Sequence, residues 1–131
     1  MVDTHSPTFR LRATVVGTPD PRGLAEFWGE LLEWEVRESE PDWVRIGPPD
    51  SEDPGLSFQL ETDHVPPVWP AGPGQQQMQL HLDVLVDDLE AAVGRAQALG
   101  ARVAEHQPEP DVLRVLLDPD GHPFCLFLPG A

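Results

Sequence analysis

The sequence contains no lysine, no tyrosine and a single cysteine, Cys125. These absences exclude a lysine Schiff base, a P-loop lysine, a tyrosine acid, an internal disulfide and a multi-cysteine zinc cluster. No apolar run approaches the roughly 20 residues of a membrane-spanning helix, and the first ten residues lack the hydrophobic region of a signal peptide. We therefore expect a cytoplasmic protein.

Positive charge is also scarce, since 8 arginines stand against 23 aspartates and glutamates, for a net charge of −15. Such a surface repels the phosphates of nucleic acids and anionic lipids, so we expect neither nucleic acid nor membrane as a partner. A cationic ligand is favoured instead. The acidic segments 33–42, 50–53 and 105–111 are interpreted as solvated faces, with a cation-attracting rim as the alternative.

What the chain does contain is an internal repeat. Residues 11–20 resemble residues 79–88 at an offset of 68, and each run ends at an aspartate, Asp20 or Asp88, that opens an amphipathic helix. The apolar stripes predict helices over 21–32 and 89–99. Because strand-like segments follow both helices, each half reads β-α-β-β-β. We expect one domain over residues 8–128, with modules 8–61 and 78–128 joined by a linker over 62–77.

The ends of these elements carry their own signals. Asp20 and Pro21 favour the start of the first helix, Asp87 and Glu90 have capping-box spacing at the second, and Gly100 is suited to end it. Strands are predicted at 33–37, 43–46, 56–60, 100–104, 112–117 and 124–128. Asp118 and Gly121 are interpreted as formers of the turn before the last strand, without a catalytic role.

Four segments carry a family resemblance: AEFWGELLEW at 25–34, HLDVLVDDL at 81–89, ALGARV at 98–103 and DPDGHPFCL at 118–126. The chain resembles the vicinal oxygen chelate superfamily of glyoxalases, extradiol dioxygenases and bleomycin-resistance proteins, and within it the actinobacterial glyoxalase-like branch. The resemblance implies an α+β fold, in which two βαβββ modules form a curved eight-stranded mixed sheet. That sheet would enclose a cup, with the helices on its outer face.

Metal-using relatives place four ligands in this cup, and the resemblance carries those positions to Ala13, Gln59, His81 and Cys125. A methyl group cannot bind a metal, an amide oxygen binds weakly, and both family carboxylates are missing. Zinc requires three or four good ligands, which Cys125 and His81 do not supply by themselves. We therefore expect no metal cofactor, with a divalent metal as the less favoured alternative.

The expected cup-lining residues follow from strand alternation. His81 shares a face with Asp83 and is interpreted as a ligand contact or a structural histidine; if it acts as a base, Asp83 would orient it. Gln59 shares a face with Ser57. Cys125 is interpreted as a small buried filler, and Trp69 as a stacking wall over the cup or a packed side chain. The complete expected ligand-binding set is Gln59, His81, Asp83, Cys125, Ala13, Ser57, Trp43, Trp69, Phe127 and Arg114. The loop histidines His5, His64, His106 and His122 are assigned no role.

Three functions are therefore compared. The favoured hypothesis is a glyoxalase/bleomycin-resistance-like protein that binds a small cationic or aromatic molecule without the family's metal, as in antibiotic resistance by sequestration. The first alternative is a lyase, isomerase or other enzyme with a non-standard or absent metal site. The second is an interaction domain whose cup is vestigial. A homodimer is expected because relatives pair modules across a dimer.

Overall fold

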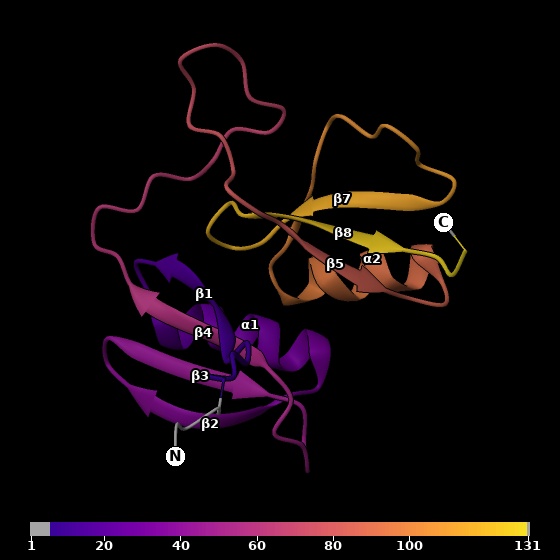
Figure 1. Cartoon of the computed structure of the whole chain (residues 1–131). Coiled ribbons are helices and arrows are strands. Elements are labelled where there is room, and N and C mark those ends of the chain that lie inside the picture. The colour runs from indigo at the N-terminus through magenta and orange to yellow at the C-terminus, as the bar shows by residue number, and fades with distance from the viewer. Residues whose placement is uncertain (1–5, 131) are drawn as a thin grey trace, which may run out of the picture.

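The structure, a computed structural model, describes residues 6–130, so that His5 lies outside the described residues (Figure 1). Its two halves have the same order of elements. The first comprises β1 (Ala13–Thr18), α1 (Pro21–Leu32), β2 (Glu35–Glu40), β3 (Trp43–Gly47) and β4 (Gly55–Leu60). The second comprises β5 (Leu82–Leu85), α2 (Leu89–Leu99), β6 (Arg102–Val103), β7 (Leu113–Leu117) and β8 (Pro123–Phe127).

The eight strands form two four-stranded mixed sheets with the same topology. Their orders are β1-β4-β3-β2 and β5-β8-β7-β6, and in each sheet the first strand runs parallel to the last. This confirms the α+β fold of two βαβββ modules. The strands are hydrogen-bonded as two sheets rather than as one eight-stranded sheet, because β1 and β5 are each an edge strand of their own sheet.

The two helices begin at equivalent aspartates. The Asp20 carboxylate accepts a hydrogen bond from the Gly23 amide at the start of α1, and the Asp88 carboxylate accepts one from the Ala91 amide at the start of α2. Side-chain oxygens at these positions satisfy amides that have no partner within the helix. The predicted capping box starting at Asp87 is therefore wrong by one residue, whereas Gly100, with a φ of 121°, ends α2 as predicted.

Aromatic side chains join the two modules in one core. Trp28 and Phe27 of α1 pack against Phe124 of β8, with ring centroids 4.9 and 6.1 Å apart and tilted edge-to-face geometry. Such edge contacts add about 0.5–1.5 kcal/mol per pair to the area that they bury. No strand of one sheet lies against a strand of the other within residues 6–130, so α1, α2 and the loops make the joint.

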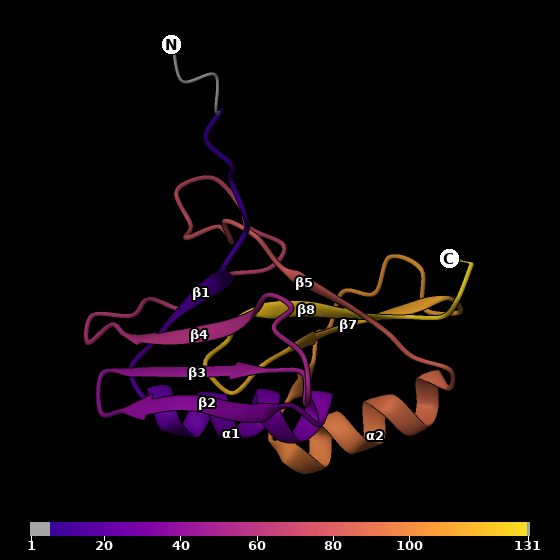
Figure 2. The same ribbon diagram turned by 60° about the horizontal axis from the view of Figure 1, so that its bottom comes forward.

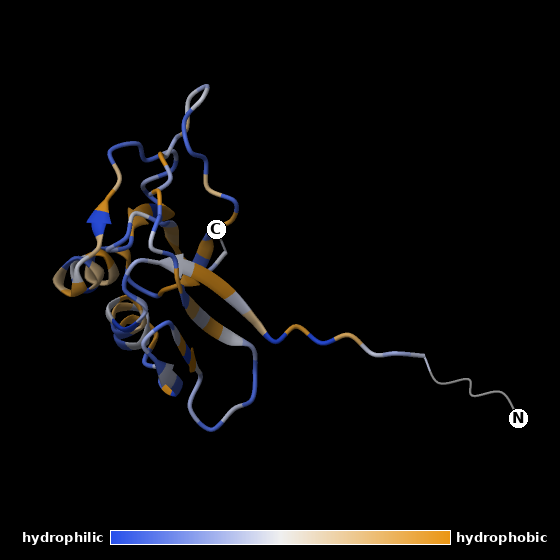
Figure 3. Cartoon of the chain, turned by 90° about the vertical axis from the view of Figure 1, so that its left-hand side faces the viewer, coloured by the Kyte–Doolittle hydropathy of each residue, from blue (hydrophilic) through white to orange (hydrophobic). Residues whose placement is uncertain are grey.

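Both helices cover the same side of the sheets, which leaves the other side open (Figure 2). The segment ahead of β1 leaves the sheet on that open side, and hydrophilic residues predominate in the connecting loops (Figure 3). Neither helix in the described part of the chain has the length and apolar character needed to cross a bilayer. The open face of each sheet is therefore where functional side chains would be accessible.

Candidate functional site

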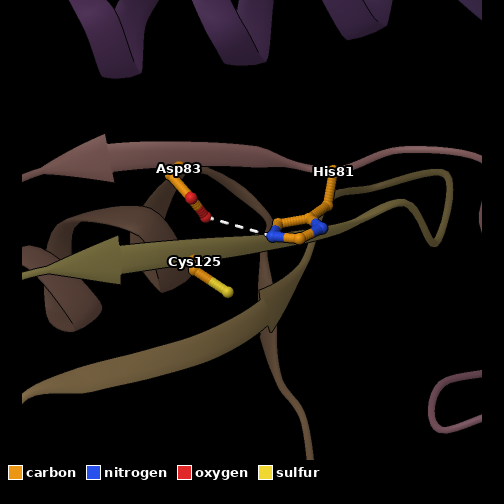
Figure 4. Close-up of side chains that lie close together, drawn as sticks. All are labelled: His81, Asp83 and Cys125. Atoms are coloured by element: carbon orange, nitrogen blue, oxygen red, sulfur yellow. Dashed lines mark ion pairs between the residues drawn. The ribbon is translucent and has the colours of Figure 1, made fainter.

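Three chemically distinct side chains converge on the open face of the second sheet. His81 directly precedes β5, Asp83 lies on β5, and Cys125 lies opposite Asp83 on β8 (Figure 4). His81 Nε2 is 3.2 Å from Asp83 Oδ1, and one potential ligand atom from each of the three residues lies within 4.8 Å of the others. The predicted association of His81 with Asp83 is thus present, and Cys125 joins it.

The electrostatics of this His81–Asp83–Cys125 cluster suppress its thiolate. Burial raises the pKa of the Cys125 thiol, and the negative charge of Asp83 raises that pKa further. Both effects favour the neutral thiol, because burial and a like charge disfavour an anion. Cys125 is half-buried, between the fully buried Phe124 and Leu126 on the opposite face. In the metal-free protein it is therefore a poor nucleophile at neutral pH.

The other expected residues lie on the first sheet. Trp43 of β3 stands opposite Gln59 of β4, and Ser57 of β4 stands between Arg45 and Val15. Gln59 is exposed, Trp43 is half-buried, and Ser57 is buried. Ala13, at the start of β1, is also on this sheet.

The four family metal positions therefore do not fit a divalent metal. Ala13 offers only a methyl group and Gln59 an uncharged amide, while Cys125 lies on β8 of the second sheet and His81 directly precedes β5. Ala13 and Gln59 lie on β1 and β4 of the first sheet, whereas Asp83 and Cys125 of the cluster lie on β5 and β8 of the second sheet. A metal bound in the family's way would lack both of its carboxylate ligands, which balance the charge of a hard or borderline cation.

Three other expected residues have different surroundings. Arg114 is wrongly placed by the sequence prediction, because it pairs with Leu126 on the helix side of β7, where its guanidinium donates to Glu90 of α2 at 2.7 Å. The Trp69 ring packs on His106, with ring centroids 5.4 Å apart, and so ties the linker to the loop after β6. Phe127 lines a cavity of about 310 Å³ together with Asp83.

Two hollows on the open side have no signal in the sequence. A crevice of about 260 Å³ separates β1 from the segment before β5, with Val15, Gly17, Gln79 and Leu80 in its walls. A second cavity, of about 600 Å³, lies at the end of the first sheet and is lined by four arginines: Arg10, Arg12, Arg37 and Arg45. The arginines come from three separate segments, 10–12, β2 and β3, so no single stretch of the sequence reveals that they share a face.

A buried carboxylate links the modules, although the sequence predicts it only as a turn former. Asp118 is fully buried, and it accepts hydrogen bonds from Trp28 Nε1, from the backbone amides of Asp120 and His122, and from His122 Nδ1. His122 Nε2 lies 3.0 Å from the Gly17 carbonyl oxygen. Because both ring nitrogens of His122 face acceptor oxygens, the geometry suits the doubly protonated ring.

The fold and this linkage define a class of protein: a pair of βαβββ modules with helices on one side and an open face on the other. A family model described as "Glyoxalase-like domain" matches residues 13–127. The chain therefore belongs to the glyoxalase-like domain family, within the vicinal oxygen chelate superfamily. A comparison with curated protein sequences gives no match.

Solved structures share the fold over nearly the whole chain. A glyoxalase/bleomycin resistance protein/dioxygenase family enzyme from Burkholderia phytofirmans PsJN has 17% identity and a TM-score of 0.65, covering 88% of this chain and 95% of that one. TnmS3, an antibiotic binding protein from Streptomyces sp. CB03234, has 20% identity and a TM-score of 0.58, covering 96% and 100%. Leishmania major glyoxalase I, which is trypanothione-dependent, has 18% identity and a TM-score of 0.60, covering 92% and 87%. At these identities the likeness concerns the fold alone.

Proposed function

We propose that this protein binds a small organic ligand on the open side of its sheets, without the four-ligand metal centre of its superfamily. The observation that carries this proposal is the pair formed by Trp43 and Gln59, which stand opposite each other on β3 and β4. An aromatic ring beside an exposed amide provides a stacking surface and a hydrogen-bonding group that sets orientation. The crevice lined by Val15 and Leu80 adds apolar surface on the same side.

Sequestration of a drug-like molecule is the proposed biological use. TnmS3, which shares the fold, is described as an antibiotic binding protein, and that description supports the proposal by analogy of fold only. The Phe27-Trp28 pair in α1 and the DPDG run at 118–121 also lead us to assign the chain to the actinobacterial branch of the family. Homodimer formation and a cytoplasmic location stay predictions.

A binding panel with one matched pair of variants tests the proposal. We expect at least one aromatic antibiotic from a panel including bleomycin and doxorubicin to bind with a Kd below 1 mM by titration calorimetry. Gln59→Ala should weaken that binding about three- to tenfold, the range expected when one hydrogen bond is lost. Gln97→Ala, which also changes an exposed glutamine but on α2, should leave it unchanged. Equal effects of the two variants, or no binding by any panel member, would contradict the proposal.

The His81–Asp83–Cys125 cluster favours a second candidate, a protein that uses a non-standard metal. Nitrogen, oxygen and sulfur donors within 4.8 Å form a donor set that suits Zn²⁺, with a fourth position left for water or ligand. Metal analysis of protein purified without chelator distinguishes the candidates. Stoichiometric zinc that is lost in both Asp83→Asn and Cys125→Ser, but kept in the control Asp111→Asn, would favour the metal-using protein. Metal-free protein that takes up no added Zn²⁺ would exclude it.

A further inference from the structure

An arginine-lined cavity gives the first sheet a local charge opposite to that of the whole chain. The cavity of about 600 Å³ is lined by Arg10, Leu11, Arg12, Arg37, Arg45, Ser51 and Glu52, and we call it the arginine pocket. It gathers half of the eight arginines of a chain whose net charge is −15. Four of the seven lining residues are arginines, and one, Glu52, is acidic. The pocket is therefore a positive region on an otherwise acidic molecule.

A β-bulge places Arg37 in this pocket. The register of β2 against β3 shifts between Val36 and Glu38, and this extra residue brings Arg37 over Gly47. A Cβ atom at Gly47 would lie only 2.1 Å from Cζ of Arg37, so the absence of a side chain there makes room for the guanidinium. Bulges commonly redirect a side chain in this way.

The partners of Arg37 hold its guanidinium but do not neutralise it. Its two terminal nitrogens donate to the backbone carbonyls of Pro48, Ser51 and Asp53, in the loop that closes one side of the pocket. Carbonyl oxygens carry no formal charge, and within residues 6–130 Arg37 forms no ion pair with a carboxylate. A guanidinium has five N–H donors, and the described residues accept hydrogen bonds from three of these in Arg37, which leaves two for a ligand.

Arg45 brings a second charge to the same face. It stands opposite Ser57 in the register of β3 and β4, two residues along the strand from Trp43 and on the same side of the sheet. Its carboxylate partner is Glu38, with Arg45 Nη1 and Glu38 Oε2 3.2 Å apart, and the Glu38 side chain is 44% exposed. An ion pair this exposed contributes little, so an incoming anion competes with it readily.

We propose that the arginine pocket binds the carboxylate of an aromatic ligand whose ring extends along Trp43. This inference rests on the proposed function and specifies the ligand class of the same open face. It reverses the expectation of a cationic ligand, because that expectation used net charge alone, whereas a bound group responds to the charges within a few ångströms. Paired arginines bind carboxylates with directed, charge-assisted hydrogen bonds.

Titration calorimetry with three naphthalene derivatives of matched shape tests this proposal. The probes are 1-naphthoate, 1-naphthalenemethanol and 1-naphthylmethylammonium, with sodium phosphate as the anion without a ring. We expect 1-naphthoate to bind at least tenfold more tightly than the other two naphthalenes. Arg45→Gln should weaken 1-naphthoate about tenfold, as expected when one charge-assisted hydrogen bond is lost. Arg95→Gln, on α2 and outside the pocket, should have no effect.

A variant that should strengthen the binding of 1-naphthoate completes the test. Glu52→Gln removes the lining carboxylate and should strengthen the binding of 1-naphthoate several-fold, whereas a folding defect would weaken it. Equal binding of all three naphthalenes, with no effect of Arg45→Gln, would overturn the arginine pocket but leave the proposed function intact. A third outcome is that phosphate binds, that Arg45→Gln abolishes this binding, and that none of the naphthalenes binds. This outcome would support the anion site and contradict the aromatic ligand. Failure of 1-naphthoate and phosphate alike would overturn the pocket.

Discussion

The indole Nε1 of Trp28 donates a hydrogen bond to Oδ2 of Asp118 at 3.1 Å, across 90 residues of sequence, and both residues are buried. This contact connects the helix of the first module to the turn before the last strand of the second. Asp118 in turn holds Asp120 and His122, whose side chains bond to Thr18 and to the Gly17 carbonyl at the end of β1. One carboxylate thus organises most of the polar contact between the modules.

The first prediction concerns the stability of this joint. Trp28→Phe keeps the aromatic packing but removes one donor, and should lower the free energy of unfolding by about 1–3 kcal/mol. Asp118→Ala removes the acceptor of four hydrogen bonds and should cost about 3–5 kcal/mol, as when a buried charge network is broken. Urea denaturation measures both, with exposed Asp111→Ala as the control. A loss below 1 kcal/mol in Asp118→Ala would contradict the assigned role.

The second prediction is a pH dependence that originates at His122. Burial lowers the pKa of this imidazole, but the hydrogen bond to Asp118, the charges of Asp118 and Asp120 and the Gly17 carbonyl together raise it above 6.5. Since the folded pKa lies above the unfolded value, the protonated ring stabilises the fold below about pH 6.5. That stabilisation is lost as the pH rises through the folded pKa.

His122→Gln isolates this contribution. The difference in unfolding free energy between the original protein and His122→Gln should be larger at pH 6 than at pH 9. The amount by which the difference at pH 6 exceeds the difference at pH 9 measures the ionisation of His122, because other groups titrate equally in both proteins. His106→Gln, which replaces an exposed histidine, is the control for the loss of a histidine. A difference that stays constant over this pH range would show that His122 does not change its ionisation on folding.

The third prediction concerns the reactivity of Cys125. Because burial and Asp83 raise the thiol pKa, the rate of reaction with a disulfide reagent in the presence of chelator should reach half its maximum above pH 9.0. Asp83→Asn removes one of the two causes and should move that midpoint to lower pH. Asp87→Asn, which lies beyond the end of β5 and lines a different cavity, is the control. A midpoint below pH 8 would contradict the suppression of the thiolate by burial and Asp83.

The fourth prediction contrasts two glycines. A Cβ atom at Gly55 would lie 2.0 Å from the backbone oxygen of Ile46, so Gly55→Ala must push β4 away from β3. We expect it to cost about 1–3 kcal/mol or more, as for other overpacked sites. Gly94, within α2, has no atom within 4 Å of the added carbon, and Gly94→Ala should stabilise by about 0.5–1 kcal/mol. Thermal unfolding of both variants measures whether each substitution lowers or raises the stability.

Elements with a local chemical cause could be predicted from the sequence. Both helices run over the predicted residues, because an aspartate cap and an apolar stripe specify each of them. The strand predicted over 33–37 begins later, at Glu35, because Glu33 adopts a left-handed conformation with φ 56° and the Trp34 amide still bonds to Gly29 of the helix. The strand predicted over 100–104 shortens to Arg102–Val103, because Ala101 still donates to Ala96 of α2.

Site geometry that depends on distant segments could be predicted only through the family resemblance, or not at all. Alternation pairs His81 with Asp83, and the resemblance puts Cys125 in the same set, but the register of β5 and β8 that places Cys125 opposite Asp83 has no local signal in the sequence. Arg37 escaped notice because a bulge cannot be read from a single strand, and its partners are backbone carbonyls that any sequence would offer. His122 was assigned no role because its acceptors lie four residues away and, on β1, 105 residues away.

The separation of the strands into two sheets has an evolutionary consequence. The arginine pocket is built from the first module, whereas the His81–Asp83–Cys125 cluster is built wholly from the second. Since no strand of one sheet packs on the other in the described part of the chain, substitutions on one open face need not be compensated on the other. After an ancestral duplication, the two copies would have been free to acquire different chemistry while sharing one interior. The same fold can thus carry two binding surfaces, one that favours anions and one that favours cations, and selection can act on each surface separately.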